Sequence, residues 1–368
     1  MIRSFFAVFI FVLVASTSHA QTQHDQRIRQ SSSDVSWGEL AIASPLMALE
    51  DFFVRNKNLS DAEKVRLMMK EDVRKTFFRL QALTRMLETQ ESEFFGEQRS
   101  YFKGIEDAIG KLDLSNSLRK ESELVGSALL INHFGRQQLA AQESLLTTMK
   151  ASGLWNEPEE TIARLKRDFA NKGSWAVGSK ERQFFIDIIS GYAKKLHKSV
   201  KENEFDNSDI EKGLHELRRR LRWILIQTTA LDGFVQFYNE ANLKAAISNW
   251  FEVAKAENPD LLMSKFMRIS TPNVEKPILV PLQSFALMTE LVSKIGKSKD
   301  GAEMQLYFRE ALDATGATVE QKNAILKKLD ENLQIEEVDH QALSRQIEAQ
   351  LAETKLLKEF AESLEKMN

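Results

Sequence analysis

Residues 211–227 read Glu-Lys-Gly-Leu-His-Glu-Leu-Arg-Arg-Arg-Leu-Arg-Trp-Ile-Leu-Ile-Gln and form the most informative stretch of the sequence. Its apolar residues recur at three- and four-residue spacing, which predicts an amphipathic helix with one stripe facing a core. At about 100° per residue, four basic residues share another arc of the helix surface, namely His215, Arg218, Arg219 and Arg222. Guanidinium forks beside a histidine suit a phosphate or carboxylate ligand. A solvated helix face carries the same pattern, so both interpretations stay open.

Composition favours an all-α chain of moderate charge. Of 368 residues, 43% are hydrophobic and 28% are charged, while only 15 are glycine and 6 are proline. This balance supports a large core built from long helices with few breaks. The net charge of -3 argues against a general nucleic-acid binder, so any polyanion site must be local.

The first residues have the pattern of an export signal. Arg3 precedes an apolar run over residues 5–15, and residue 20 is a small alanine suited to cleavage, so residues 1–20 are predicted to be a signal peptide. Residues 21–36 are rich in Gln, Ser and Asp and are predicted to be a disordered lead-in. We therefore expect an exported protein without a membrane span in its mature part. The bacterial periplasm fits this pattern, and an extracellular location is the alternative.

Capping signals mark the beginnings of several helices. Ser44-Pro45 predicts one start, and Glu157-Pro158 predicts another. Capping boxes are predicted at residues 60–63 and at residues 208–211, each followed by a long amphipathic run. These signals and the helical periodicity predict that residues 45–365 are mostly helix, with no sheet.

Breaks in the pattern divide the chain. Four of the six prolines lie within residues 259–281, which predicts an irregular crossover, and residues 156–178 form a lesser break. The last fifty residues carry apolar side chains at helical spacing, which predicts a capping helix or a coiled-coil contact that could hold a protein partner. The predicted units are two helical-bundle halves, residues 37–155 and 156–315, and a C-terminal helical segment, residues 316–368.

A weak internal repeat relates the two halves. Residues 71–80 align with residues 215–224, and each stretch is followed by an Ile-Gly-Lys sequence with an aspartate nearby. These later sequences, at residues 109–113 and 295–300, are interpreted as turns. Two matching pairs in the same order predict a duplicated helical unit, although short matches between charged helices also arise by chance.

The repeat resembles the CHAD family, whose name refers to a conserved-histidine α-helical domain. His215, Arg218 and Arg222 match its histidine–arginine helix, and residues 295–300 are similar to its later glycine-containing turn. The similarity covers about residues 60–310. The resemblance implies two helical-bundle halves around a basic channel that binds inorganic polyphosphate without catalysis or a cofactor. The first copy has Glu71 and Phe78 where the family has a histidine and a cation, and the second lacks two further basic residues.

Other basic residues extend the predicted polyanion site. Arg74 and Lys75 belong to the first copy, and the helix before residue 211 carries Lys194, Lys198 and Lys201 on one face. These three lysines could extend an anion track from the His215 helix. Cations at the C-terminal end of a helix also complement its dipole without any ligand.

Enzyme signatures are missing from the sequence. There is no phosphate-binding glycine loop, nucleophile elbow or zinc-binding His-Glu-x-x-His, and the absence of cysteine excludes disulfides and thiolate chemistry. The duplicated Glu-x-x-His motif of a di-metal bundle is also missing. The single copy, at residues 337–340, is interpreted as part of a helix cap, and His133 is interpreted as a packed histidine.

The sequence thus predicts a non-catalytic protein that binds polyphosphate or another polyanion. A periplasmic structural or protein-interaction scaffold is the alternative, and a helical-bundle hydrolase is a more distant one. A concave site with few carboxylates around the His215 face would favour ligand binding. Pairing of its cations with Glu211 and Glu216 would favour the scaffold.

Overall fold

A computed structural model describes residues 36–368 except residues 174–178, 242, 273 and 334–338. The described part is mostly helical and has almost no strand, which confirms the all-α prediction. The predicted signal peptide lies outside the described residues, and so does the predicted lead-in apart from Ser36. Ser36 is buried and caps a helix, so the lead-in prediction was wrong for that residue.

The first half of the chain forms six helices within the described residues. The long antiparallel pair α5 and α6 extends away from the others, and α7 returns to pack on α2. The helices are α2 (Trp37–Arg55), α3 (Asp61–Lys70), α4 (Val73–Leu87), α5 (Ser92–Val125), α6 (Ala128–Ala151) and α7 (Pro158–Lys172).

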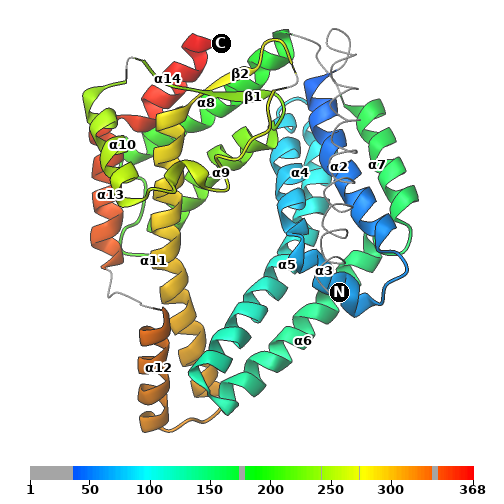
Figure 1. Ribbon diagram of the computed structural model, residues 1–368, viewed down its shortest axis with the longest axis vertical. Coiled ribbons are helices and arrows are strands. Elements are labelled where there is room, and N and C mark those ends of the chain that lie inside the picture. The colour runs from blue at the N-terminus through cyan, green and yellow to red at the C-terminus, as the bar shows by residue number, and fades with distance from the viewer. Residues whose placement is uncertain (1–35, 174–178, 242, 273, 334–338) are drawn as a thin grey trace, which may run out of the picture.

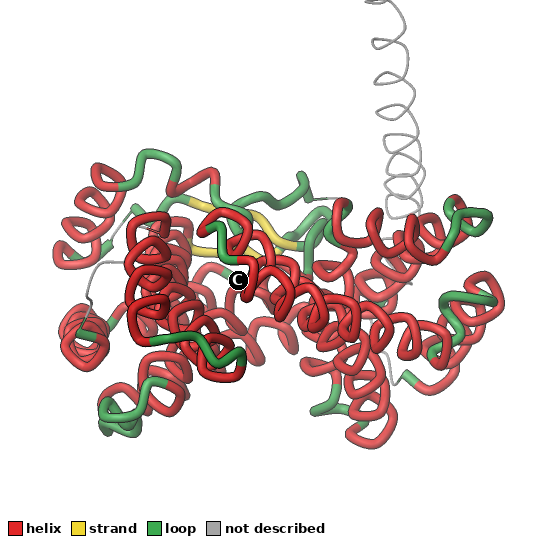
Figure 2. Tube along the Cα trace, turned by 90° about the horizontal axis from the view of Figure 1, so that it is seen from below, coloured by secondary structure: helices red, strands yellow, loops and turns green. Residues whose placement is uncertain are grey.

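The second half contains the remaining helices and two short strands. Its described elements are α8 (Ser179–Lys201), the π-helical turn η1 (Glu211–His215), α9 (Glu216–Ala230), β1 (Val235–Tyr238), α10 (Ala245–Glu257), the 3₁₀ turn η2 (Leu261–Met263), β2 (Ile278–Pro281), α11 (Leu282–Ala314), α12 (Val319–Leu333), α13 (His340–Thr354) and α14 (Leu356–Met367). The strands are parallel, with Val235 opposite Ile278, and lie side by side among the helices (Figure 2). The prediction of no sheet was therefore wrong for this pair.

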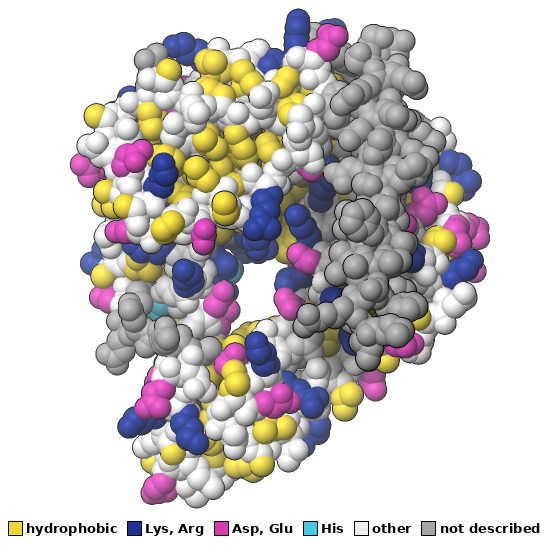
Figure 3. Space-filling view, in the orientation of Figure 1, with side chains coloured by type: hydrophobic (Ala, Val, Ile, Leu, Met, Phe, Trp, Pro, Cys, Tyr) yellow, Lys and Arg dark blue, Asp and Glu magenta, His cyan; other side chains and the backbone are white. Residues whose placement is uncertain are grey.

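The helices enclose an opening through the molecule. The α5–α6 pair descends on one side and α11 with α12 on the other, and the two meet at a tip (Figure 1). The opening is visible in the space-filling view, with Lys and Arg side chains gathered at its upper edge and acidic side chains at its sides (Figure 3). The molecule is thus a ring.

Two separate apolar clusters hold the ring together. The main core runs through α2, α4, α8, α9, α11 and α14, and it is continuous across the predicted boundaries near residues 155 and 315. The tip has its own small cluster, here called the tip core, in which Phe134 of α6 lies 5.2 Å from Phe308 of α11 between ring centroids. The tip core closes the ring at a distance from the main core.

Some predicted helix starts hold and others do not. The capping box at Ser60 is present, and Pro158 occupies the first turn of α7. The start predicted at Ser44 was wrong, because α2 begins at Trp37 and Pro45 lies inside it. The second capping box was also wrong: Asp209, not Ser208, accepts hydrogen bonds from the backbone of Glu211 and Lys212.

The C-terminal segment consists of α12, α13 and α14 instead of one capping helix. α14 packs against α8, β2 and α11, and α13 packs against α8. Their apolar stripe is buried within the chain: Leu343, Ile347, Leu351, Leu357, Phe360 and Leu364 are all at most 9% exposed. The face predicted to hold a protein partner is therefore used for folding. No helix among the described residues is both long enough and apolar enough to cross a membrane.

Candidate anion-binding site

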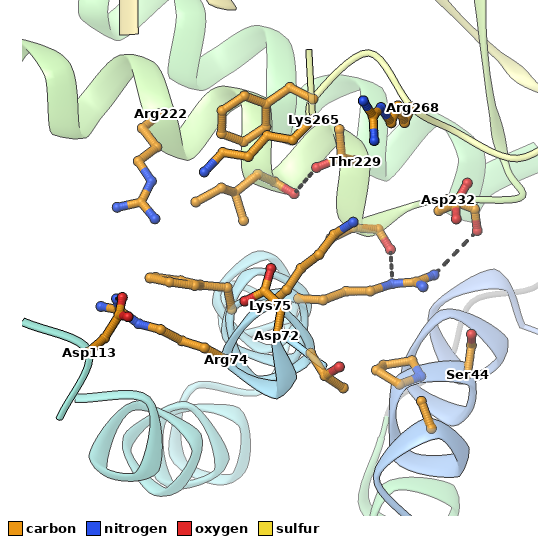
Figure 4. Close-up of a pocket in the computed structure, with 18 residues that line it drawn as sticks. Ser44, Asp72, Arg74, Lys75, Asp113, Arg222, Thr229, Asp232, Lys265 and Arg268 are labelled. Carbon is orange, nitrogen blue, oxygen red and sulfur yellow. Dashed lines mark hydrogen bonds and ion pairs between the residues drawn. The ribbon is translucent and has the colours of Figure 1, made fainter. Parts of the chain in front are cut away.

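A concave site lies between α4 and α9, with α2 on one side and the loop after η2 on another (Figure 4). It has a volume of about 450 Å³, and we call it the basic pocket. Six cationic residues and three carboxylates line it; the cations are Arg74, Lys75, Arg79, Arg222, Lys265 and Arg268, and the acids are Asp72, Asp113 and Asp232. The excess of cations gives the pocket a positive potential.

Arg222 is the member of the predicted helix face that lines the basic pocket. Its guanidinium carbon lies 4.6 Å from the centre of the Phe78 ring, and Arg74 lies 5.3 Å from the same ring. Burial lowers the pKa of Arg222, and the neighbouring charges of Arg218 and Arg74 lower it further. No ion pair joins Arg222 to a carboxylate of the described residues. Phe78 thus supports two cations, and Glu106 and Asp300 oppose the pKa shift of Arg222 without forming an ion pair with it.

Arg74 and Arg218 occupy similar surroundings in the two halves. Arg74 on α4 lies against Gly110 of α5, and a Cβ added to that glycine would meet its guanidinium. Arg218 on α9 lies against Gly296 of α11, where an added Cβ would come within 2.6 Å of Nη2. Both glycines lie within long helices, so the prediction of turns at residues 109–113 and 295–300 was wrong.

Arg74 forms closer ion pairs with carboxylates than Arg218 does. Arg74 pairs with the buried Glu106 at 2.7 Å and with Asp113 at 3.3 Å. Arg218 donates from Nε to the Val292 carbonyl at 3.2 Å and lies 4.0 Å from Asp300. Part of the charge of Arg74 is therefore already neutralised inside the fold.

Lys265 and Lys75 complete the cationic side of the basic pocket. Burial lowers the pKa of Lys265, and the charges of Arg222, Arg218 and Lys75 add to this effect while Asp72 opposes it. Neither lysine forms an ion pair with a carboxylate in the part of the chain that the structure describes. An anion in the pocket would relieve the repulsion among these groups.

The other two cations, Arg79 and Arg268, donate hydrogen bonds to backbone carbonyl oxygens. Arg79 donates from Nε to the Ala230 carbonyl at 3.0 Å and from Nη2 to the Asp232 carbonyl at 3.4 Å, and burial lowers its pKa. Arg268 donates to the Met263 carbonyl at 3.0 Å. Carbonyl oxygens are neutral, so these hydrogen bonds do not neutralise either arginine. The Asp232 carboxylate accepts hydrogen bonds from Ser270, and its negative charge opposes the effect of burial on the pKa of Arg79.

The structure does not bring the four residues of the predicted helix face together. Arg219 forms an ion pair with Glu216 and lines a second cavity of about 430 Å³. There, Arg85 lies 4.7 Å from the Trp223 ring and 3.2 Å from the hydroxyl of Tyr192. Arg222 thus lines the basic pocket and Arg219 the second cavity, whereas His215 and Arg218 line neither.

His215 lies outside the basic pocket, at the junction of η1 and α9. Its Nε2 is 3.9 Å from Glu211, and its buried Nδ1 has no hydrogen-bond partner among the described residues. Burial lowers the pKa of His215, and Lys299 lowers it further. The histidine is thus held largely neutral near pH 7.

The three lysines predicted to extend an anion track lie on α8, away from the basic pocket. Lys194 pairs with Glu365 at 2.6 Å, and Lys198 lies 3.8 Å from Glu202. Lys198 and Lys201 are in the last turn of α8, where their charge complements the helix dipole. None of the three lines either cavity, so the expected continuous track does not form.

Sequence reasoning missed Arg79, Lys265 and Arg268. The two residues in the loop after η2 follow no helical period, so no local pattern places them beside Arg222. Arg79 lies in the predicted first repeat, but its approach to Ala230 depends on how α4 packs on α9. Only the long-range packing of the chain reveals these positions.

Two of the other histidines, His340 and His133, have structural contacts. His340 lies 3.0 Å from the hydroxyl of Ser298, and Asp339 caps α13 as the cap interpretation of this segment requires; Glu337 lies outside the described residues. His133 lies 3.0 Å from Gln137 and packs edge-on against Phe134. No cluster of three or more potential metal ligands occurs among the residues that the structure describes.

Comparison with known proteins adds no relative to this picture. No protein-family model, no curated protein and no solved structure matches the chain.

Proposed function

We propose that the chain is a non-catalytic protein that binds a phosphate-rich anion in the basic pocket, with inorganic polyphosphate as the ligand suggested by the resemblance to CHAD proteins. The observation that carries the proposal is the group of Arg222, Lys75 and Lys265, which share one concave site without an ion-pair partner among the described residues. Burial lowers the pKa of Lys265, the charges of Arg222 and Lys75 lower it further, Asp72 opposes this effect, and a bound polyanion would reduce the repulsion further.

The positions of Arg74 and Lys75 support the same proposal. Arg74 and Lys75 lie in the first turn of α4, which has no acidic residue and no side-chain cap. The helix dipole favours anions at this end, so cations there do not stabilise the helix. A bound phosphate would interact favourably with the basic side chains and with the helix dipole at this end, where the N-cap residue Asp72 makes no side-chain cap.

The repeated contact of an arginine with a helix glycine supports the proposed duplication. Arg74 with Gly110 and Arg218 with Gly296 occupy corresponding places in the aligned repeats. A CHAD-like origin, export and a periplasmic location complete the proposal, and they rest on the sequence patterns.

Calorimetry with inorganic polyphosphate at low salt tests the function. Arg222→Ala should weaken binding by roughly 1.5–3 kcal/mol, the usual contribution of a hydrogen bond to a charged group. Arg219→Ala is the matched control, because Arg219 lies on the same helix, is 60% exposed and already pairs with Glu216. Affinity should fall as salt rises, since the interaction is chiefly electrostatic.

Two results would contradict the proposal. Absence of binding by the folded wild-type protein at low salt would favour the scaffold alternative. Equal losses in Arg222→Ala and Arg219→Ala would show that binding is spread over the surface instead of centred on the basic pocket.

A further inference from the structure

The basic pocket is compact. Its volume of about 450 Å³ falls within the range of about 300–1,000 Å³ that is usual for small-molecule sites. Lys194, Lys198 and Lys201 do not continue it into a long groove. The positive charge is therefore concentrated at one place, which suits a short run of phosphates better than a long chain.

The pocket also has an apolar wall. Pro45 and Ala48 of α2, Ile226 and Ala230 of α9 and Phe266 of the loop line it together with the cations. In Figure 4, Arg74, Arg222 and Lys265 lie on one side, whereas Ser44, the neighbour of Pro45, lies on α2 at the opposite side. Pro45, Ile226 and Ala230 are buried in the fold. A purely inorganic anion would therefore leave chiefly the exposed Ala48 and the half-buried Phe266 in contact with water.

We infer that the basic pocket takes a compact organic oligophosphate, in which two or three phosphates are joined to a small apolar or aromatic group. This inference rests on the proposed function and names the class of its ligand. The phosphates would contact Arg222, Lys75 and Lys265, whose three positive charges match a diphosphate or triphosphate. The organic group would cover the apolar wall where Ala48 and Phe266 expose it.

A comparison of three probes tests the inference: inorganic tripolyphosphate, adenosine triphosphate and long-chain polyphosphate. Adenosine triphosphate should bind about 5- to 30-fold more tightly than tripolyphosphate, as expected if it buries about 40–80 Å² of apolar surface at about 25 cal/mol/Å². Long-chain polyphosphate should bind no more tightly per phosphate than tripolyphosphate, because the pocket holds only a few phosphates.

The variant Ala48→Asn tests the role of the apolar wall. Ala48 is exposed on the wall of the pocket, so a polar side chain there disturbs the wall without entering the core. This variant should lose most of the preference for adenosine triphosphate while it keeps its affinity for tripolyphosphate. Ala140→Asn places the same change on an exposed position of α6 outside the pocket and should leave both affinities unchanged.

The outcomes separate the inference from the proposed function. Equal binding of the two triphosphates, or a preference that survives in Ala48→Asn, overturns the inference and leaves phosphate binding intact. Much tighter binding of long-chain polyphosphate per phosphate also overturns it, because that result requires an extended track. Failure of all three probes to bind overturns the proposed function as well.

Discussion

Arg74 and Arg218 each lie against a helix glycine, Gly110 and Gly296, whose lack of a side chain leaves room for the guanidinium. Each guanidinium occupies space beside a helix glycine that any Cβ would enter. Glycine normally weakens the middle of a helix by roughly 0.5–1 kcal/mol relative to alanine. Its presence at Gly110 and Gly296 is therefore explained by the close approach of the two arginines.

This explanation predicts the effect of Gly110→Ala. The added methyl group should displace Arg74 from the buried Glu106, leaving that carboxylate poorly paired. Gly104→Ala on the same helix is the control, because nothing lies within 4 Å of its added Cβ. In urea denaturation, Gly110→Ala should be about 1–3 kcal/mol less stable than Gly104→Ala. Equal stability of the two variants would contradict the close approach.

Glu181 predicts a pH dependence of stability. This carboxylate on α8 is 1% exposed and accepts bonds from the Ser36 hydroxyl at 2.6 Å and from the backbone N–H groups of Trp37 and Gly38 at 2.6 and 2.7 Å. Burial nevertheless raises its pKa above the ordinary value of 4.5. Its contribution to stability is therefore fully present below about pH 4.5 and is lost as pH rises through the raised pKa.

Glu181→Gln should flatten this part of the stability profile. The free energy of unfolding, measured in urea between pH 4.5 and 7, should fall less steeply with rising pH than in the wild type. The slope is the decisive quantity, and an unchanged slope would show that Glu181 does not titrate in this range.

At the scale of elements, α14 acts as part of the main core. Phe360 is fully buried and lies 6.4 Å from the Phe285 ring of α11. Phe360→Ala should destabilise the protein by about 3–5 kcal/mol. Met367→Ala is the control on the same helix, because Met367 is 46% exposed, and it should change stability by less than about 0.5 kcal/mol. Thermal or urea unfolding measures both, and similar small effects would mean that α14 is only loosely attached.

The elements that sequence predicts best are those with local signals. The capping box at Ser60 is complete within four residues, so its pattern sufficed. The start of α2 also carries a local signal, because the Ser36 hydroxyl accepts a hydrogen bond from the Glu39 N–H three residues later. The contribution of Glu181, which accepts from the first two N–H groups of this helix, comes from a distant helix and has no local signal. The parallel pairing of β1 with β2 likewise joins segments that are far apart in the chain.

The sequence predicted some of the basic residues that line the basic pocket but not all of them. The amphipathic pattern of α9 identified Arg222, and the repeat identified Arg74 and Lys75. The same pattern grouped Arg219 with them, but the Arg219 side chain pairs with Glu216 and lines the second cavity. Lys265 comes from an irregular loop, which periodicity does not describe.

At the scale of the whole molecule, the tip core controls whether the ring is closed. Phe308 is fully buried there, whereas Leu306 on the same helix is 53% exposed. Phe308→Ala should therefore open the tip while the main core stays folded, and Leu306→Ala should not.

Hydrogen exchange measures this difference. In Phe308→Ala, amides of α12 should exchange about a hundredfold faster or more, whereas amides of α4 should keep their wild-type rates. If both helices exchanged faster together, the tip and the main core would unfold as one cooperative unit.

The contact between Phe134 and Phe308 also has a kinetic consequence. The α5–α6 hairpin joins helices that follow each other in the chain, whereas the tip joins Phe134 to Phe308, which are far apart in the chain. The loop-closure entropy lost on forming the tip is therefore larger. We expect the two sides of the molecule to fold first and to meet at the tip last. In refolding followed by pulsed deuterium labelling, amides of α4 and α9 should acquire protection before those at the end of α11. Late closure would leave a folded but open intermediate, through which a long polymer could enter sideways before the ring is complete.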